Sequence, residues 1–185
     1  MKKLLLAAII SLTTISSVAL AEIKVGIILG FTGPIETLTP AMRDSAKLAF
    51  AEVSASGALL GGETITPLIA DSTCVDSDAA VAAAELIVSD GAVAIMGADC
   101  SGVTGAIVTN VAVPNGITMV SPSATSPGLT SLADNGLFFR TAPSDAKGGQ
   151  VLAQVALDRG LTSVAVTYTN NDYGKGLADV FEASF

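Results

Sequence analysis

The chain of 185 residues contains no histidine and no tryptophan, and aromatic residues make up only 4% of it. The lack of histidine excludes Ser-His-Asp and Cys-His nucleophilic mechanisms and every metal site that needs an imidazole ligand. Basic residues are also scarce, since 9 Lys and Arg stand against 17 Asp and Glu and give a net charge of −8. A chain this acidic repels phosphate backbones, so nucleic acid is not an expected partner. With 50% hydrophobic residues, the chain is apolar enough to bury a core instead of staying disordered.

Sequence motifs for bound phosphate are missing as well. No G-x-x-x-x-G-K-[ST] segment occurs, because the GKG run at 174–176 has neither the spacing nor the hydroxyl. The turn at 26–33 is not G-x-G-x-x-G, which excludes a dinucleotide fingerprint. Asp76 and Asp78 could suggest a cation site, but they lie at the start of a predicted helix, where acidic residues are favoured without a metal. We therefore expect no cofactor and no metal.

The beginning of the chain has the pattern of an export signal. Lys2 and Lys3 give it a positive start, an apolar run follows at 4–12, and Ala-Leu-Ala at 19–21 is a cleavage signal. A membrane anchor is the alternative, but hydroxyl residues interrupt the apolar run well short of the ~20 residues that a span needs. No cysteine lies near the cleavage site, so no lipid anchor is expected. The sequence predicts a cleaved signal peptide over 1–21.

Only two cysteines are present, Cys74 and Cys100. In an exported protein a lone pair of cysteines favours a disulfide, and closing the loop between them would stabilise the fold by roughly 3–4 kcal/mol in the chain-entropy description. Two free buried thiols are the alternative. A zinc site is a poorer interpretation, because two cysteines without histidine cannot complete a zinc shell.

Strand and helix patterns alternate along the rest of the chain. Several strands are nearly continuous apolar runs, which is typical of a parallel sheet covered by helices on both faces, and so of an α/β fold. Pro67 lies within the second strand and predicts an edge or bulge position there. Strands are predicted at 23–29, 64–70, 92–96, 117–120, 137–140 and 163–169, and helices at 39–56, 76–90, 102–113, 145–159 and from 174 onward.

This alternation breaks at 121–144, where a loop rich in Ser, Thr, Pro and Gly intervenes. We interpret the break as the passage from a first lobe at 22–141 to a second lobe that begins at 142–185. The second-lobe residues are too few for a core of their own, and the chain ends inside a predicted helix. We therefore expect the second lobe to continue beyond Phe185.

Two polar turns follow neighbouring predicted strands, GADCSG at 97–102 and SPSAT at 121–125. Open parallel sheets bind ligands beyond the carboxyl ends of their strands. Ser101 falls at a helix start, where free N–H groups favour an anion such as a carboxylate, and a plain helix cap is the alternative. For Ser123 and Thr125 the alternative is an ordinary Ser/Pro turn. These turns are the first candidate binding site.

Several segments in order resemble one family. On these segments the chain is similar to the first half of a periplasmic Leu/Ile/Val-binding protein, the branched-chain amino-acid receptor of an ABC importer. The resemblance covers 22–185 and implies the type I periplasmic-binding-protein fold, a three-layer αβα parallel-sheet lobe plus the start of a second α/β lobe. It rests on IKVGIILGFTGP (23–34), SGALLGG (56–62), MVSPSAT (119–125), FFRTAPSD (138–145), NDYGKG (171–176) and two cysteines at the family's disulfide spacing.

The resemblance also implies roles for individual residues. Ser101 and Thr125 match positions that hold the ligand α-carboxylate through hydroxyl and backbone N–H groups. Ser123 matches a position whose carbonyl helps to bind the α-ammonium, and Ala124 lines the same loop. Tyr173 matches a second-lobe aromatic residue that closes over the ligand.

Two further positions enter the expected site. Asp145 lies near the passage between the lobes, where it faces the cleft or supports the hinge, with a helix cap as the alternative. Leu38 stands where such receptors often have an aromatic residue against the ligand side chain, so the pocket could suit a different side chain, an amide, urea or another small polar solute. The acid that pairs with the ligand ammonium is expected beyond Phe185.

The resemblance implies a periplasmic solute receptor and not an enzyme. Its two lobes would close as a monomer on an amino acid or a small amide-like solute, and the closed form would dock on an ABC permease in the inner membrane. A ligand-sensing ectodomain of a signalling receptor is the alternative. An exported hydrolase is the weaker third reading, because the chain has no G-x-S-x-G elbow and no histidine.

Overall fold

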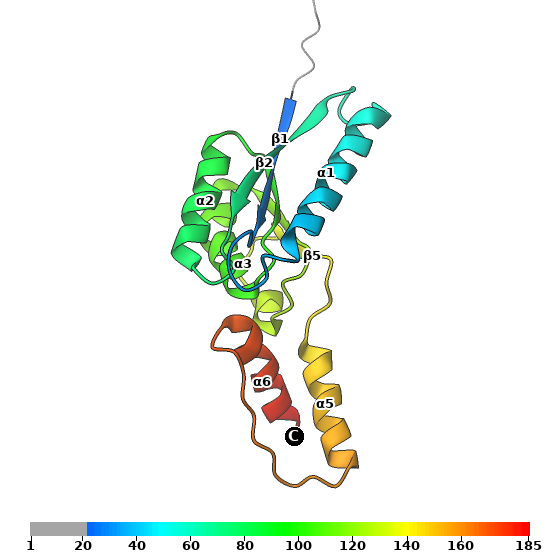
Figure 1. Cartoon of the computed structure of the whole chain (residues 1–185), viewed down its shortest axis with the longest axis vertical. Helices are drawn as coiled ribbons and strands as arrows, with labels where there is room; N and C mark the ends of the chain where they lie inside the picture. The colour runs from blue at the N-terminus through cyan, green and yellow to red at the C-terminus, as the bar shows by residue number, and fades with distance from the viewer. Residues whose placement is uncertain (1–21) are drawn as a thin grey trace, which may run out of the picture.

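A five-stranded parallel sheet forms the centre of the first lobe in the computed structural model, which describes residues 22–185 (Figure 1). The predicted signal peptide lies outside the described residues. The strand order is β2-β1-β3-β4-β5, so the direction of winding reverses between β1 and β3. The strands are β1 (Glu22–Leu29), β2 (Thr64–Asp71), β3 (Ala94–Gly97), β4 (Thr118–Ser121) and β5 (Phe138–Arg140), and each pairs parallel with its neighbours.

Helices cover both faces of this sheet, which confirms the predicted three-layer lobe (Figure 1). The apolar run of β1 shows how: Ile27 and Leu29 pack with Ala46 of α1 (Thr39–Ser56) on one face. Ile28, which points the other way, belongs to the core formed with α2 (Ser77–Ser89) and α3 (Ser101–Ile107). A strand buried on both faces needs a continuous apolar sequence, because successive side chains point to opposite sides.

Helix ends and the sheet edge follow the predicted local signals. Helix α1 ends at Gly57, which adopts the left-handed conformation with φ of 65°. The carboxylate of Asp76 caps α2 by accepting from the Ala79 N–H at 3.0 Å, which accounts for this acid without a metal. Strand β2, which contains Pro67, lies at an edge of the sheet, as predicted.

The helix predicted over 102–113 is irregular in the structure. It consists of α3, a π-helical segment η1 (Val108–Ala112) and a short α4 (Val113–Asn115). Pro114 explains the irregularity, because it has no N–H to donate back into the helix and its ring crowds the carbonyl four residues earlier. The wider turn keeps Val108, Val111 and Ala112 fully buried against the sheet.

The strand predicted at 163–169 is absent from the described residues, so this prediction is wrong. The segment runs beside α5 (Ala146–Asp158) and α6 (Asp172–Ser184) without pairing to a strand (Figure 1). A strand needs a neighbour for its ladder hydrogen bonds, and all five described strands belong to the first-lobe sheet. The boundary between the lobes at 141 and 142 stays a prediction.

Helix α6 contacts both α5 and the first lobe. It packs closely on the 3-10 turn η2 (Pro127–Ser131), because a Cβ placed on Gly176 would lie 2.8 Å from Ser126 Oγ. In the described part of the chain, none of the helices combines the length and the apolarity that a membrane span requires.

Candidate functional site

The polar turns singled out in the sequence meet at the carboxyl ends of the strands, which we call the carboxyl edge of the sheet. All the strands are parallel, so the loops that leave their carboxyl ends gather there, next to the reversal of winding between β1 and β3. This edge carries the turns 97–101 and 121–126 and the segment 141–145 that leads towards α5.

Ser101 joins the first turn to the second. Its side chain is buried, with 3% of the residue exposed, and its Oγ accepts from the Ser126 N–H at 3.1 Å. Cys100, not Ser101, occupies the cap position of α3. The helix-cap interpretation of Ser101 is therefore wrong, and its hydroxyl instead fixes the distance between the two turns.

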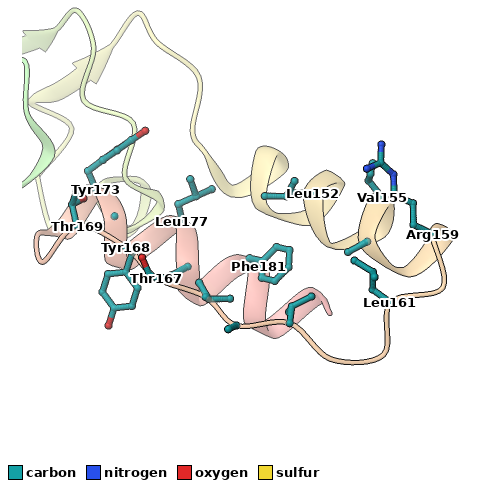
Figure 2. Close-up of a pocket in the computed structure, with 16 residues that line it drawn as sticks. Leu152, Val155, Arg159, Leu161, Thr167, Tyr168, Thr169, Tyr173, Leu177 and Phe181 are labelled. Atoms are coloured by element: carbon teal, nitrogen blue, oxygen red, sulfur yellow. The ribbon is translucent and has the colours of Figure 1, made fainter.

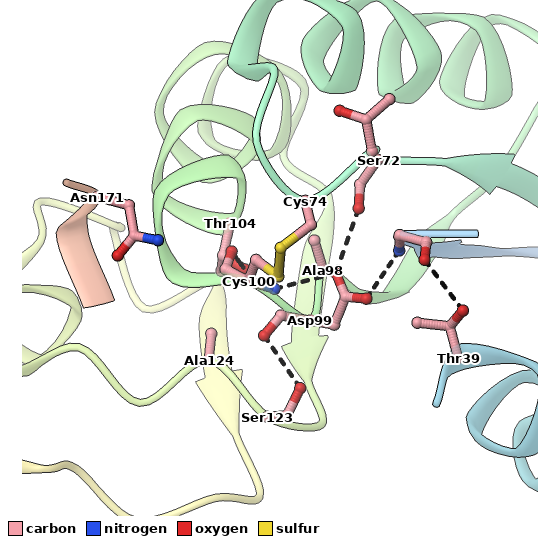
Figure 3. The surroundings of a disulfide bond; sticks show 12 residues. Thr39, Ser72, Cys74, Ala98, Asp99, Cys100, Thr104, Ser123, Ala124 and Asn171 are labelled. Carbon is pink, nitrogen blue, oxygen red and sulfur yellow. Dashed lines mark hydrogen bonds between the residues drawn. A yellow bond between two sulfur atoms is a disulfide. The ribbon is translucent and has the colours of Figure 1, made fainter. Parts of the chain in front are cut away.

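The second turn is anchored at several points. Ser123 Oγ donates to the Asp99 carbonyl at 3.0 Å (Figure 3), and the buried Ala124 donates its N–H to Ser121 Oγ at 3.0 Å. Arg140 at the end of β5 donates to the carbonyls of Ala124 (3.2 Å) and Ser126 (2.9 Å). These bonds make 121–126 more than an ordinary exposed Ser/Pro turn.

Arg140 is a residue that sequence reasoning missed. Besides its two carbonyl contacts, its Nη2 donates to Thr130 Oγ1 at 2.6 Å. The guanidinium therefore clamps the loop between 124 and 130. A lone cation at the end of a predicted strand, close to a loop rich in Ser and Pro, is the signal that could have indicated it.

Thr125 and Asp145 form a pair between the predicted lobes. Thr125 Oγ1 donates to Asp145 Oδ2 at 2.7 Å, and the Asp145 N–H donates to the Thr125 carbonyl at 3.0 Å. Asp145 stands at the cap position of α5, but its side chain makes no capping hydrogen bond. The carboxylate faces the first-lobe turn instead, so the helix-cap interpretation of Asp145 is wrong.

Leu38 and Tyr173 lie outside this hydrogen-bonded group. Leu38 precedes α1 with 61% of its surface exposed. Tyr173, 46% exposed, lines an open apolar pocket of about 610 Å³ between α5, α6 and the segment 161–169 (Figure 2). In the described part of the chain, no hydrogen bond joins either residue to Ser101 or Thr125.

A groove of about 720 Å³ opens beside Ser101, between α3, η2 and α6. Its lining mixes small residues of the first lobe with charged residues of α6. It includes Ser101, Gly102, Ser126, Pro127, Asp172 and Lys175. Ser101 thus lies at the wall of a space that residues of both predicted lobes line.

The predicted disulfide is confirmed. Cys74 and Cys100 are joined with an S–S distance of 1.98 Å and a Cα–Cα distance of 5.2 Å (Figure 3). The bond ties the loop after β2 to the start of α3, one residue before Ser101. The two cysteines are therefore neither free thiols nor zinc ligands.

Two carboxylates at this edge were also missed by sequence reasoning. Asp71 at the end of β2 accepts from the N–H groups of Phe31 (2.9 Å) and Thr73 (2.8 Å), and from the Thr32 hydroxyl (2.7 Å). Asp99 lies after β3, with 3% of its surface exposed. An acid after a strand is common, so only its position inside the turn could have singled out Asp99. No group of three or more Cys, Asp or Glu side chains in the described residues is placed to hold a metal ion.

Comparison with known proteins identifies relatives over nearly the whole chain. The family profile described as periplasmic binding protein matches residues 22–185. Leu/Ile/Val-binding protein BraC3 of Rhizobium johnstonii is 32% identical over 183 residues, which are 98% of this chain and 49% of that protein. The Leu/Ile/Val-binding protein of Escherichia coli K12 is 33% identical over 178 residues, 95% of this chain and 47% of that protein. By name these relatives are binding proteins, not enzymes.

Solved structures share the fold. The substrate-binding protein LivJ of Streptococcus pneumoniae, in complex with isoleucine, is 28% identical with a TM-score of 0.73, covering 89% of this chain and 47% of that chain. An ABC transporter substrate-binding protein of Desulfitobacterium hafniense, in complex with Leu, is 28% identical with a TM-score of 0.68 at 89% and 47% coverage. The chain thus spans about half the length of the relatives that it matches. Its motifs, its sheet and these matches agree, and the chain belongs to the periplasmic binding protein family.

Proposed function

We propose that this chain forms one side of the ligand cleft in a solute receptor. The receptor binds a branched-chain amino acid, or a small amide-like solute, between two lobes. The observation that carries the proposal is the meeting of two polar turns of the first lobe, 97–101 and 121–126, beside the second-lobe helix α6. Ser101 Oγ accepts from the Ser126 N–H where these turns meet. Family membership supports it, as do two relatives named for Leu, Ile and Val and a solved relative in complex with isoleucine.

One half of the edge suits a carboxylate. Ser101 Oγ accepts from the Ser126 N–H, which leaves its own hydrogen free to donate. In the described part of the chain the Thr125 N–H donates to no protein acceptor. Several neutral donors can hold a carboxylate without a buried arginine, and an unpaired buried charge would be costly.

The other half suits an ammonium group. Thr125 donates its single hydroxyl hydrogen to Asp145. Its hydroxyl oxygen can therefore only accept a further hydrogen bond. Asp145 adds a negative charge at 2.7 Å from that oxygen, and the Ser123 carbonyl is a further acceptor on the same turn. We therefore assign the Thr125 N–H to the ligand carboxylate and the Thr125 hydroxyl to its ammonium.

The proposal extends to location and partner. We infer that the receptor works in the periplasm and delivers its solute to an ABC permease of the inner membrane. A relative named as an ABC transporter substrate-binding protein and another named as a branched-chain amino acid transporter substrate binding protein support this inference. Contacts from both lobes to the solute would favour the closed form over the open one, and the permease would bind the closed form.

The test uses the full-length mature protein, with both predicted lobes, and NMR titration, which detects weak binding. Millimolar leucine should shift the amide signals of Ser101, Ser126 and Thr125. Leucinamide lacks the carboxylate and 4-methylpentanoate lacks the ammonium, so each isolates one half of the site. If no amino acid or amide in a broad panel shifts these signals, the proposed function is wrong.

Variants separate the two halves. Thr125→Val removes the hydroxyl but keeps the backbone N–H, so leucine affinity should fall at least about tenfold, in line with ~1.5–3 kcal/mol for a hydrogen bond to a charged group. Binding of 4-methylpentanoate should be nearly unchanged, because this ligand has no ammonium. Thr118→Val is the matched control, since Thr118 is exposed at the amino end of β4, away from the groove. Equal losses for both ligands in Thr125→Val would contradict the assignment.

A further inference from the structure

The carboxylate of Asp99 connects the ends of three neighbouring strands. Its Oδ2 accepts from the N–H of Gly30, just after β1, at 2.7 Å. Its Oδ1 accepts from the hydroxyl of Ser72, just after β2, at 3.2 Å and from the N–H of Cys100 at 3.0 Å. Figure 3 shows this carboxylate between Ser72 and the turn that carries Ser123.

In the part of the chain that the structure describes, no Lys or Arg side chain forms an ion pair with Asp99. The ion pairs among residues 22–185 are Arg43–Asp44 and Lys175–Asp179, and neither involves Asp99. A buried carboxylate without a cation is stabilised by hydrogen bonds from neutral N–H and O–H groups, and Asp99 accepts three of them. The three donors around Asp99 are therefore fixed relative to one another by one rigid acceptor.

Asp99 also reaches the two turns of the proposed site. Its carbonyl accepts from Ser123 Oγ at 3.0 Å, and Ser101 follows two residues later in the chain. Side chain and backbone of this one residue thus link the ends of β1 and β2 to both hydroxyl-bearing turns.

We propose that Asp99 is a positioning residue for the ligand site, which sets the spacing between Ser101 and the 121–126 turn without touching the solute. This inference rests on the proposed function. The sheet alone does not require it, because β1 pairs with β2 along its whole length, all of β3 pairs with β1, and the core between sheet and helices is apolar. The carboxylate acts beyond the ends of the strands, where only loops remain to be held.

An amide cannot replace the carboxylate. In Asp99→Asn one terminal atom becomes an NH2 group, which donates and does not accept. In one orientation it faces the Gly30 N–H, and in the other it faces the Cys100 N–H. Either way one backbone N–H loses its acceptor and is repelled, so the turn must move.

The experiment compares Asp99→Asn with Ser54→Ala in the same full-length mature protein. Ser54 Oγ accepts from the Ile65 N–H at 2.9 Å, near the amino end of β2. Ser54→Ala thus also leaves one backbone N–H without an acceptor, but at the amino ends of the strands, opposite the proposed site. We expect Asp99→Asn to weaken leucine binding about tenfold, which corresponds to ~1.4 kcal/mol, and Ser54→Ala to leave the affinity within about twofold.

Amide hydrogen exchange gives a readout that needs no ligand. The Ser126 N–H, held by Ser101 Oγ, should exchange faster in Asp99→Asn than in Ser54→Ala when the two variants are matched for global stability with urea. If the unaltered chain binds no amino acid, the proposed function fails, but exchange at Ser126 still tests Asp99. Equal affinity losses, or equal exchange at Ser126, in the two variants would overturn the proposal.

A milder variant covers the case in which Asp99→Asn does not fold. Ser72→Ala removes one of the three donors and keeps the carboxylate. It should weaken leucine binding about threefold, ~0.65 kcal/mol, and accelerate exchange at Ser126. Unchanged affinity and exchange in Ser72→Ala would then count against the proposal.

Discussion

Hydrogen bonds from neutral groups govern the ionisation of Asp71 at the end of β2. Burial alone would raise the pKa of this carboxyl group. The Thr32 hydroxyl and the backbone N–H groups of Thr73, Thr32 and Phe31 together outweigh burial and lower its pKa. All of these bonds favour the ionised form, because only the carboxylate can accept from every one of them.

Asp71 should therefore make the fold sensitive to acid. A carboxyl group whose pKa is lower in the folded than in the unfolded state stabilises the fold above its unfolded pKa, and this contribution is lost as the pH falls through the folded pKa. In Asp71→Asn we expect a lower free energy of unfolding at neutral pH and a weaker decline on acidification, measured by urea denaturation over a pH series. Glu52→Gln, on the exposed side of α1, should keep the decline of the unaltered protein. The same flattening in both variants would contradict this role of Asp71.

At the scale of elements, the packing of α5 against α6 depends on one glycine of an adjacent pair. A Cβ on Gly149 would lie 2.9 Å from Val180 Cγ1 and 3.2 Å from the Phe181 backbone nitrogen. A Cβ on Gly148 would meet nothing within 4 Å. Gly149 therefore permits the close approach of the two helices, whereas Gly148 has no such task.

This difference predicts opposite effects of the same substitution at neighbouring positions. Gly148→Ala should stabilise the protein by about 0.5–1 kcal/mol, because alanine favours helix over glycine. In Gly149→Ala the same gain is offset by overpacking, which costs about 1–3 kcal/mol, so a net loss of ~1 kcal/mol is expected. Thermal and urea unfolding of both variants would measure this, and a stabilised Gly149→Ala would show that α6 does not hold the position described.

Elements whose signals are local could be predicted from the sequence. Helix α1 carries its apolar spacing within its own residues and its glycine stop directly after them, and β1 carries its apolar run. The segment 163–169 has the same apolar, β-branched character as β1, yet it forms no strand because no neighbour lies beside it. The π-helical turn η1 depends on how Pro114 meets the buried residues before it, which periodicity alone does not reveal.

At the scale of the whole molecule, the Cys74–Cys100 bond closes a loop that contains α2 and β3. Its sequence separation of 26 corresponds to about 3–4 kcal/mol in the chain-entropy description. We expect the double variant Cys74→Ser, Cys100→Ser to lose that amount of unfolding free energy in urea. The unaltered native protein should take up no alkylating reagent until it is reduced, and labelling of both thiols without reductant would contradict the bond.

The candidate site could be predicted only in part. Ser101, Ser123 and Thr125 stand out in the sequence because polar turns follow apolar strands, and the structure brings these turns together. Asp145 is also expected near the cleft or the hinge, but the sequence does not show its bond to Thr125, 20 positions away. Nor does it show the Gly30–Asp99 bond, which joins residues 69 apart. Such contacts depend on the winding of the strands, which no short segment encodes.

The contacts of Arg140 have a consequence for the entropic cost of the proposed solute binding. Its guanidinium holds two carbonyls and one hydroxyl of a single loop, so that loop has lost its freedom during folding. An incoming molecule then meets a rigid surface and is spared about 0.5–1.5 kcal/mol for each side chain that it would otherwise immobilise. Binding at this edge of the sheet should therefore require little rearrangement of the loop between 124 and 130, and reorganisation is left to the more distant helices.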